Sequence, residues 1–335
     1  MGHAETFHGY APDLGYAFLR DTIAKNDYQG RGCDISSDEI FVSDGAKCDC
    51  SNIQEIFSLD NKIAVCDPVY PVYVDSNVMA GRAGDYDAAT ERFTNVIYMP
   101  CTAENNFTPE LPKETPDLIY LCFPNNPTGA LMNRATLEAI VAMAREVGAY
   151  ILCDEVYRHL TQEDEWCESI VDLYEKGISV SSMSKVFSLA GLRMGWIATH
   201  DEAARKAFLS HRDYNLISCG MFDDAIASIA LRHSDVMLKR NQRIVRENLA
   251  ILDDWIKENP HFFYTKPKAG TTALVYYDFD IPSYEFCKRM YHETGAFVTP
   301  GDCFEQPHSM RVGYACDVNT LRDGLAAVTK FAATL

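Results

Sequence analysis

The sequence predicts an α/β protein with a mainly parallel, mixed sheet covered by helices on both faces, followed by a smaller α+β unit. From residue 40 to residue 198, short apolar runs alternate with amphipathic helical patterns, which is typical of strands joined by crossover helices. The chain has 335 residues, of which 47% are hydrophobic, and a single core usually stops growing below this length. We therefore expect a large domain at 25–230 and a small C-terminal domain at 231–335, with residues 1–24 as an N-terminal segment.

The chain opens with a turn-rich stretch from His8 to Gly15. Residues 16–24 follow with the spacing of an amphipathic helix, and we expect Phe18, Leu19 and Ile23 to share its apolar face.

Strand and helix patterns then follow one another along the chain. Strands are predicted at 39–43, 63–68, 118–123 and 149–153, and later at 271–277 and 310–314. Helices are predicted from near Cys48 to Ile56, at 135–147 before Gly148, and at 234–257, 284–294 and 318–334. The helix at 234–257 is long enough to link the two domains. Residues 83–113 are polar and irregular, which predicts a surface excursion with one strand at 96–99.

The composition argues against several classes of function. A net charge of −18 disfavours nucleic acid or an anionic membrane surface as a partner, because both require a basic surface. No apolar run could span a membrane, and the first residues lack the features of a signal peptide, so we expect a cytoplasmic protein. The twelve cysteines are scattered, which favours reduced thiols, and the nine histidines show no metal-ligand spacing. The Gly-x-Ser-x-Gly motif of triad hydrolases does not occur.

The strongest functional signal lies at residues 181–195. A lysine in a partly desolvated, cation-rich pocket has a lowered pKa, which lets its amine attack a carbonyl, and Lys185 fits this description. Ser182, Ser184 and Arg193 supply hydroxyl donors and a fixed cation, which suit a phosphate close to that amine. The implied ligand is a phosphorylated aldehyde. The alternative is a solvated lysine in a serine-rich turn.

Two loops that follow predicted strands are further candidates. After 39–43 the chain turns into a helix, and the free amides of Gly45, Ala46 and Lys47 at its N-terminus could bind phosphate, although many such turns bind nothing. The loop at 124–129 reads Pro-Asn-Asn-Pro-Thr-Gly directly after a buried strand. Loops at the carboxyl ends of such strands are where α/β proteins bind ligands.

Four side chains complete the candidate set. Tyr70, in a proline-stiffened loop, could stack on an aromatic ring or simply anchor the loop. Asp154 ends a predicted strand, where it could pair with a pyridinium nitrogen or cap a helix, and Tyr157 is close enough in sequence to contact the same ring. Arg311 carries the planar fork that binds a carboxylate, although an isolated arginine is more often a surface residue.

Ser-x-Ser-Lys followed by Gly-Leu-Arg-x-Gly resembles the lysine segment of the pyridoxal-phosphate-dependent aminotransferases of class I/II, which have fold type I. The resemblance runs along nearly the whole chain and implies the cofactor pyridoxal 5'-phosphate. It implies that Lys185 holds the cofactor covalently, while Ser182 and Arg193 bind its phosphate.

The resemblance also implies roles for the other candidates. Tyr70 would stack on the cofactor ring, Asn126 would donate to its phenolic oxygen, and Tyr157 would hydrogen-bond the same phenolate. Asp154 would keep the pyridine nitrogen protonated, and Arg311 would bind the substrate's α-carboxylate beside Asn126. Tyr10 would reach across a homodimer to the partner's cofactor phosphate.

Residues 1–130 resemble the LL-diaminopimelate aminotransferases in particular, whereas the segments around Asp154 and Lys185 resemble the aspartate and aromatic branches. We therefore expect a divergent or hybrid member. Family members usually carry several dozen residues before the position of Met1, including an arm that packs on the partner, so the sequence as it stands predicts weakened substrate affinity.

The resemblance implies a homodimeric enzyme that transfers the amino group of an L-amino acid to a 2-oxo acid, with LL-diaminopimelate and 2-oxoglutarate as the candidate pair. Two alternatives remain open. The first is another reaction on the same cofactor, by a lyase, a decarboxylase or a cyclising enzyme on an amino acid. The second is a cofactor-binding protein with impaired catalysis.

Overall fold

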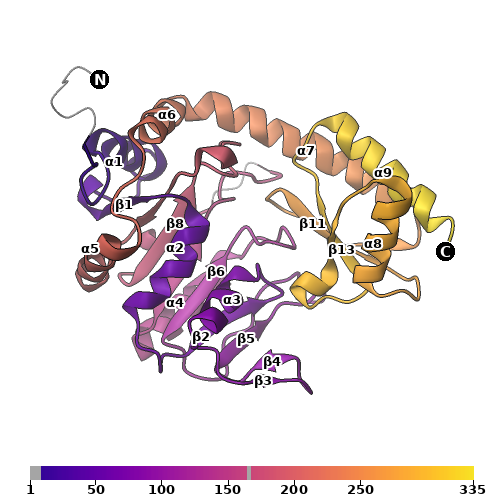
Figure 1. Ribbon diagram of the computed structural model, residues 1–335, viewed down its shortest axis with the longest axis horizontal. Helices are drawn as coiled ribbons and strands as arrows, with labels where there is room; N and C mark the ends of the chain where they lie inside the picture. Colours follow the sequence, from indigo (N-terminus) through magenta and orange to yellow (C-terminus); the bar gives the residue numbers. More distant parts are fainter. Residues whose placement is uncertain (1–8, 164–166) are drawn as a thin grey trace.

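The structure is a computed structural model that describes residues 9–163 and 167–335 (Figure 1). His8, which opens the predicted turn-rich stretch, lies outside the described residues. Within the described part, no helix combines the length and the apolar character needed to cross a membrane.

A seven-stranded mixed sheet organises the first part of the chain, in the order β1-β9-β8-β7-β6-β2-β5. Its strands are β1 (Ile40–Ser43), β2 (Ile63–Asp67), β5 (Val96–Pro100), β6 (Leu118–Cys122), β7 (Tyr150–Asp154), β8 (Gly177–Ser182) and β9 (Gly195–Ala198). Neighbouring strands from β5 to β8 pair in parallel, and β9 pairs antiparallel with both β8 and β1. The predicted α/β class with a mainly parallel, mixed sheet is therefore confirmed.

Six α-helices accompany this sheet in the described part of the chain. They are α1 (Ala17–Ile23), α2 (Ala46–Asn52), α3 (Val72–Met79), α4 (Arg134–Val147), α5 (Glu202–Asn215) and α6 (Met221–Arg232). Helix α4 ends at Gly148, whose φ of 77° is left-handed, as the sequence predicts. Helix α2 begins at Ala46, two residues before the predicted start.

One prediction for α1 is wrong. Leu19 and Ile23 are fully buried, but Phe18 is 43% exposed and stacks on Tyr16 with ring centroids 5.4 Å apart. Because adjacent helix positions point about 100° apart, this short helix buries Leu19 and Ile23 while it directs Phe18 outward.

The polar stretch at 83–113 contains more regular structure than a surface excursion. Strands β3 (Tyr86–Asp87) and β4 (Arg92–Phe93) form a small antiparallel pair. The predicted strand is present as β5, and it joins the edge of the main sheet through parallel pairing with β2. Met99, at a fully buried position in β5, shows why the sheet includes this strand.

The last part of the chain forms a separate four-stranded antiparallel sheet, in the order β10-β11-β13-β12. Its elements are β10 (Phe262–Phe263), β11 (Thr272–Tyr277), β12 (Thr299–Pro300), β13 (Ser309–Gly313), α8 (Ser283–Thr294) and α9 (Val318–Ala332). An aromatic cluster of Phe262, Tyr277, Phe286 and Phe331 lies in its core. The predicted α+β character of this part is confirmed.

Helix α7 (Ser234–Glu258) extends along the top of the molecule, from the side of the first sheet to the side of the second (Figure 1). Near its start, Met237 and Leu238 pack against the core of the first sheet. Further along, Val245, Leu249 and Leu252 belong to the second core. The helix therefore contacts both cores, as predicted.

A buried ion network supports the turn that follows β7. The Arg158 guanidinium contacts Asp27 at 2.8 Å and also Glu155, and each of the three side chains is at most 4% exposed. Burial alone would raise the pKa of Asp27, but the charge of Arg158 and a hydrogen bond from His159 outweigh it and hold that pKa well below its ordinary value. Asp27 is therefore ionised at neutral pH, and both buried acids pair with Arg158.

We expect Arg158→Met to lower the free energy of unfolding by about 3–5 kcal/mol at pH 7, because it removes the guanidinium that pairs with both buried carboxylates. Chemical denaturation measures the effect. Since the pKa of Asp27 is depressed in the folded state, the stability from this pair is present above the ordinary aspartate pKa of about 4 and is lost below it. The difference in unfolding free energy between the variant and the parent should therefore become smaller as the pH falls. A difference that stays constant with pH would contradict this account.

Candidate active site

The carboxyl ends of β6, β7 and β8 meet at one edge of the sheet, as parallel pairing requires. This edge lines a cavity of about 300 Å³, which we call the site cavity. Eleven of the predicted site residues line it, namely Ala46, Lys47, Tyr70, Asn126, Asp154, Tyr157, Ser182, Ser184, Lys185, Arg193 and Arg311. Topology thus brings together side chains that are far apart in sequence.

Two predicted site residues do not line the site cavity. Gly45 lies directly behind it, and its φ of 125° is a conformation that favours glycine. A Cβ at Gly45 would approach Nη2 of Arg193 to 2.7 Å, so the missing side chain makes room for the guanidinium. Tyr10 is 85% exposed. Its proposed reach to a partner subunit remains a prediction.

One side of the site cavity gathers donors suited to an anion. Ser43, Gly195 and Ser182 lie in register across β1, β9 and β8, which places the Gly45 turn beside the Lys185 loop. The Ser182 hydroxyl accepts a hydrogen bond from the amide of Ser184 at 3.2 Å, which leaves its own proton free to donate.

Arg193 is held on the same side. It adopts a left-handed φ of 51°, and its Nη1 donates to the carbonyl of Ala190 at 3.0 Å. The first turn of α2 adds backbone donors, because the amides of Ala46 and Lys47 precede Cys48, which donates back to the Gly45 carbonyl at 3.0 Å. This side of the cavity can therefore hold a phosphate.

Lys185 projects into the site cavity, where its side chain is exposed. Partial desolvation and the positive charges of Arg311 and Arg193 lower the pKa of its amine, against the opposing charge of Asp154. A larger fraction of the amine is consequently neutral near pH 7 than for an ordinary lysine, which is what attack on a carbonyl needs.

Asp154 is the buried carboxylate of the site, with 6% exposure. Tyr73 donates its hydroxyl proton to Oδ2 at 2.7 Å, and the amide of Val156 donates to Oδ1 at 3.3 Å. Burial raises the pKa of Asp154 to about 6, although both hydrogen bonds and the charge of Lys185 oppose the rise. No α-helix begins at this point of the chain as described, so the helix-cap alternative for Asp154 is not supported.

Tyr73 was not singled out from the sequence. It is fully buried, stacks on Tyr120 with centroids 5.4 Å apart, and meets Tyr70 edge-on at 5.9 Å. Cys50, Cys122, Thr271 and Thr272 also line the cavity without having been predicted. The available signal was the spacing of Tyr73, three residues after Tyr70, since this places both on one side of the loop and first turn of α3.

We expect Tyr73→Phe to raise the pKa of Asp154 above about 6, because the lost hydrogen bond stabilises the ionised carboxyl. A cofactor that needs this carboxyl ionised should then bind up to about tenfold more weakly near and below pH 6, because one hydrogen bond to a charged group corresponds to about a factor of ten in affinity. Well above that pH, the carboxyl is ionised in both proteins and the affinities should be nearly equal. Equilibrium titration across pH measures the effect. Tyr120→Phe is the matched control, since its hydroxyl only accepts a 3.4 Å contact from Asn77. Equal losses at every pH would contradict the argument.

The opposite wall of the site cavity carries Arg311, from β13 of the second sheet. Its Nη1 donates to Oδ1 of Asn126 at 3.0 Å and its Nη2 to Thr299 at 3.2 Å, and its guanidinium lies 4.9 Å from the Phe304 ring centroid. These contacts fix the fork in place. Because Oδ1 of Asn126 accepts from Arg311, the amide nitrogen of Asn126 stays available as a donor.

Tyr157 completes this wall and is 5% exposed. Burial raises the pKa of its phenol well above the ordinary value, although the charge of Arg311 opposes the rise. The phenol is therefore protonated at neutral pH and can donate a hydrogen bond into the cavity.

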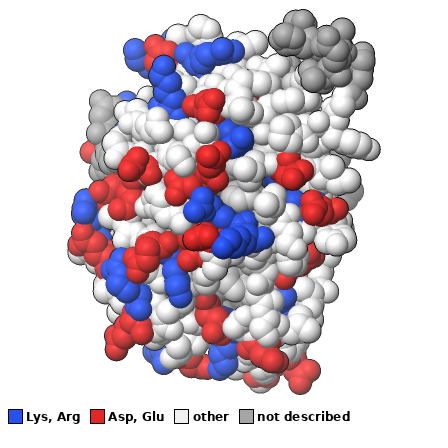
Figure 2. Space-filling view, turned by 90° about the vertical axis from the view of Figure 1, so that its left-hand side faces the viewer, with Lys and Arg blue, Asp and Glu red and all other residues white. Residues whose placement is uncertain are grey.

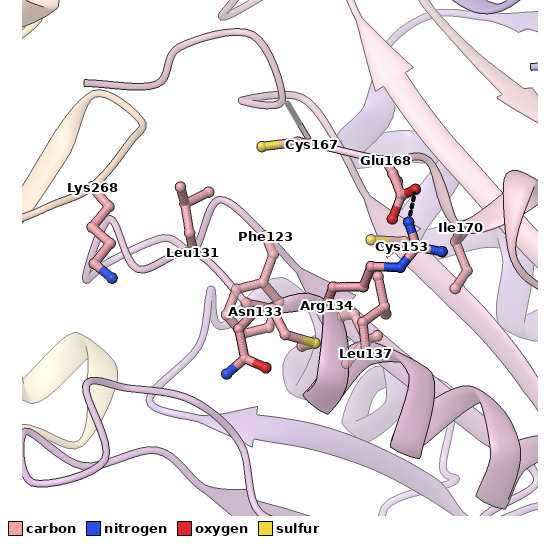
Figure 3. A pocket seen from close by; sticks show the side chains of 12 residues that line it. Phe123, Leu131, Asn133, Arg134, Leu137, Cys153, Cys167, Glu168, Ile170 and Lys268 are labelled. Atoms are coloured by element: carbon pink, nitrogen blue, oxygen red, sulfur yellow. Dashed lines mark hydrogen bonds and ion pairs between the residues drawn. The ribbon is translucent and has the colours of Figure 1, made fainter. Parts of the chain in front are cut away.

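Volume alone does not identify the site. A second cavity, of about 390 Å³, is lined by Leu121 and Cys153, and Figure 3 shows it from close by. Leu121 and Cys153 alternate with the site residues Cys122 and Asp154 along β6 and β7, so they face the other side of the sheet. The polar rim of this second cavity includes Arg134, which is already paired with Glu168 and Glu138. This cavity lacks the reactive lysine and the cluster of anion donors that mark the site cavity.

The fold and this site define a class of protein, in which a lysine with a lowered pKa, an anion cradle and a buried carboxylate surround one cavity at the sheet edge. The "Aminotransferase class I and II" profile matches residues 1–328. The chain belongs to this family.

Relatives agree with this assignment. The chain is 59% identical over 199 residues to an LL-diaminopimelate aminotransferase of Lachnospira eligens, a match that covers 58% of this chain and 49% of the relative. It is 39% identical over 320 residues to an LL-diaminopimelate aminotransferase of Desulfotalea psychrophila, covering 91% and 77%. This chain therefore spans about half the length of the Lachnospira relative and of a similar one from Agathobacter rectalis. The resemblance of residues 1–130 to these enzymes is thus confirmed, and the match over 320 residues shows that the likeness extends beyond residue 130 at lower identity.

Solved structures confirm the fold. A PLP-dependent aminotransferase of Streptococcus suis superimposes with a TM-score of 0.85 at 33% identity, over 97% of this chain and 84% of that one. An aromatic aminotransferase of Pyrococcus horikoshii gives a TM-score of 0.87 at 22% identity, over 98% and 89%. At that identity the second comparison speaks for the fold alone. The predicted fold type I of this family is confirmed.

The family implies pyridoxal phosphate, and the site cavity fits this group on three counts. Lys185 offers an amine for the aldehyde, and Ser182, Arg193 and the first amides of α2 offer donors for the phosphate. The room that Gly45 leaves beside Arg193 forms part of that cradle. Asp154 offers a buried carboxylate for a ring nitrogen.

Proposed function

We propose that the protein is a pyridoxal-phosphate-dependent aminotransferase that moves the amino group of an L-amino acid to a 2-oxo acid. The single observation that supports this most is the placement of Lys185 and Asp154 in one cavity, with the anion donors beside Lys185. The names of the relatives favour LL-diaminopimelate as the amino donor. We take 2-oxoglutarate as the acceptor to test first.

Each site residue has a task in this proposal. Ser182, Arg193 and the amides of Gly45, Ala46 and Lys47 would hold the cofactor phosphate, and Tyr70 would cover a face of its ring. Asn126 and Tyr157 would donate to the ring's oxygen. When bound, the cofactor supplies an electron-withdrawing ring that weakens bonds at the substrate's α carbon.

Proton movement would fall to Lys185. With its pKa lowered, Nζ can accept the proton from the α carbon and return it to a neighbouring carbon. Asp154, ionised above about pH 6, would hold a proton on the ring nitrogen while this happens. Arg311 would bind the α-carboxylate through both arms of its fork, which orients the substrate for proton transfer at Lys185.

We expect Arg311→Lys to raise KM for the amino donor by about tenfold to a hundredfold with little change in kcat, because a point charge cannot replace a bidentate contact. Steady-state kinetics measure the effect. Arg289→Lys is the matched control. Like Arg311, Arg289 lies over a phenylalanine ring, that of Phe331 at 5.4 Å, and its ion pair is with Glu293 on α8, away from the site cavity. An unchanged KM would remove the role proposed for Arg311.

The experiment that tests the proposed function measures keto-acid formation from a panel of amino donors with 2-oxoglutarate, using protein loaded with pyridoxal phosphate. Transamination of LL-diaminopimelate in preference to other donors supports the proposal in full. Turnover of another donor corrects the substrate. Loss of CO₂, or of a side-chain group, without amino transfer would indicate a decarboxylase or lyase. Cofactor absorbance without any product would indicate a binding protein.

We propose further that the protein is a homodimer. Helix α6 exposes Phe222, Ile226 and Ile229, which are 63%, 47% and 54% exposed and spaced to form one stripe. Figure 2, which looks onto the side that carries α1 and α5, shows a broad area of uncharged residues beside the charged ones. Sedimentation of the parent and of Ile226→Glu tests the proposal. A monomeric parent would refute it.

Two remaining proposals concern location and domain organisation. None of the twelve cysteines, all of which lie in the described part of the chain, forms a disulfide, which supports the cytoplasm as the compartment. The first core includes residues from Leu19 to Leu231 and the second from Val245 to Phe331, which supports a large domain at 25–230 and a small one at 231–335. Residues 1–24 would be an N-terminal segment whose Leu19 and Ile23 pack into the first core. Limited proteolysis tests the boundary.

A further inference from the structure

Helix α7 carries two buried asparagines on a single face. Asn241 is 5% exposed and Asn248 is 2% exposed. They lie seven positions apart, so they point in nearly the same direction, roughly 10 Å apart along the helix. A buried amide destabilises a core unless its hydrogen bonds are made. The partners of these two side chains therefore indicate what the amides do.

Asn241 bonds to the backbone carbonyl of Val186, the residue that follows Lys185. Its Nδ2 donates to the carbonyl of Val186 at 2.8 Å, and its Oδ1 accepts from Nη1 of Arg240 at 2.7 Å. These two contacts fix the orientation of the amide, because a rotated one would set NH₂ against the guanidinium and oxygen against the carbonyl. Val186 is itself buried. The backbone beside Lys185 is thus attached to α7.

Asn248 makes the corresponding attachment on the other side of the site cavity. Its Nδ2 donates to the carbonyls of Tyr314 at 2.7 Å and Cys316 at 2.9 Å. Only an NH₂ group can serve two carbonyls, so this orientation is fixed as well. Both carbonyls directly follow β13, the strand that carries Arg311. The strand end is therefore attached to the same helix.

Between these two points, α7 also contacts the segment that follows Tyr157. Gln242 donates to the carbonyl of His159 at 2.9 Å, and Nε of Arg246 donates to the carbonyl of Thr161 at 3.1 Å. One helix thus bonds to the backbone next to three site residues that come from different parts of the chain. A regular helix has a fixed rise per residue, so it sets the spacing between the points it holds.

We propose that Asn241 and Asn248 are positioning residues, and that α7 sets the distance between the amine of Lys185 and the carboxylate-binding fork of Arg311. Neither asparagine lines the site cavity, although both line a neighbouring cavity of about 480 Å³ that Lys185 also lines. Their amide nitrogens donate to backbone carbonyls, so each would act through the backbone that it holds. The inference rests on the proposed function, since that function assigns proton transfer to Lys185 and substrate binding to Arg311.

The two asparagines should have different kinetic effects. Asn241→Asp keeps the size of the side chain and its contact with Arg240 but replaces the donor to Val186 with an acceptor. We expect kcat to fall by about tenfold to a hundredfold with KM little changed, because small displacements of a reacting group have effects of this size. Asn248→Asp should instead raise KM for the amino donor by about tenfold, with a smaller change in kcat.

Asn259→Asp is the matched control. This asparagine sits just beyond the end of α7 and donates to the Trp255 carbonyl at 2.7 Å, far along the chain from any site residue. The same change of charge there should alter neither constant. If both asparagine variants show a lower kcat together with a higher KM, in proportion to their loss of stability, the asparagines only support the fold and the proposal is overturned.

Hydrogen–deuterium exchange of the cofactor-free protein provides a readout that does not depend on turnover. Exchange should rise at 183–189 in Asn241→Asp and at 312–317 in Asn248→Asp, each without the other. Uniform or unchanged exchange would refute the positioning role. If exchange rises locally in each variant but the parent shows no transamination, the proposed function is refuted, while the attachment of the two segments to α7 is supported. Where an aspartate variant fails to fold, Asn241→Ser and Asn248→Ser carry the same test, because the shorter hydroxyl cannot reach the carbonyls.

Discussion

Replacing Lys185 with alanine is expected to lower transamination at least about a thousandfold. The change removes the amine that would hold the cofactor and the base that would move the substrate's proton, and base catalysis alone contributes about a hundredfold to ten-thousandfold. Among the described residues, the other lysine that lines the site cavity is Lys47. It belongs to the first turn of α2, so we do not expect its amine to replace that of Lys185. Turnover with a 2-oxo acid, measured together with the visible absorbance of the covalently bound cofactor, checks the result.

Lys206→Ala serves as the control for that experiment. Lys206 is 75% exposed and forms an ordinary helical pair with Glu202 at 2.6 Å, so its loss should leave both readouts unchanged. Two outcomes of the Lys185 variant are informative. Loss of turnover with the phosphate cradle still able to bind the cofactor noncovalently would separate the chemical role from the binding role. A variant that kept full turnover and the parent's absorbance would refute the proposed function.

The parts of the site that the sequence predicts are those fixed by strand order. Asn126 follows one strand that an apolar run marks, and Asp154 ends another. The strand before Lys185, β8, is not among those predicted, but parallel pairing brings its end to the same edge. The motif around Lys185 is local, so its serines and arginine can be recognised without knowledge of the fold. For these residues, the pattern of elements and the short motifs together are sufficient.

The parts that the sequence does not predict depend on contacts between distant segments. The hydrogen bond from Tyr73 to Asp154 joins residues 81 positions apart, and that from Asn241 to Val186 joins residues 55 apart. A tyrosine near a turn or an asparagine in an amphipathic helix has no local feature that names its partner. Phe18 illustrates the same limit at a smaller scale, since only packing decides which neighbouring apolar residue of a short helix is buried.

Asp154→Asn is expected to lower turnover by about a hundredfold to a thousandfold, an estimate based on the loss of a preorganised charge from a buried site. The substitution changes charge but hardly changes shape. With its oxygen toward the Val156 amide, the new amide presents its nitrogen to Tyr73, whose hydroxyl can rotate to accept, so the surrounding contacts persist. What disappears is the negative charge that would keep a ring nitrogen protonated, and no other carboxylate lines the site cavity among the described residues.

The matched control for Asp154 is Asp201→Asn, because Asp201 caps α5 by accepting from the amide of Ala204 at 2.7 Å and asparagine caps a helix equally well. It should leave turnover unchanged. Asp154→Glu separates charge from position, since it retains the carboxylate but moves it by one methylene, and its turnover should fall between those of the parent and the asparagine variant. The pH dependence adds an independent check. Because burial raises the pKa of Asp154 to about 6, parent activity should decline as the pH falls through that value, while the residual activity of Asp154→Asn should lack this acidic limb. If the limb persisted in the asparagine variant, another group would be responsible for it, and the role assigned to Asp154 would have to be given up.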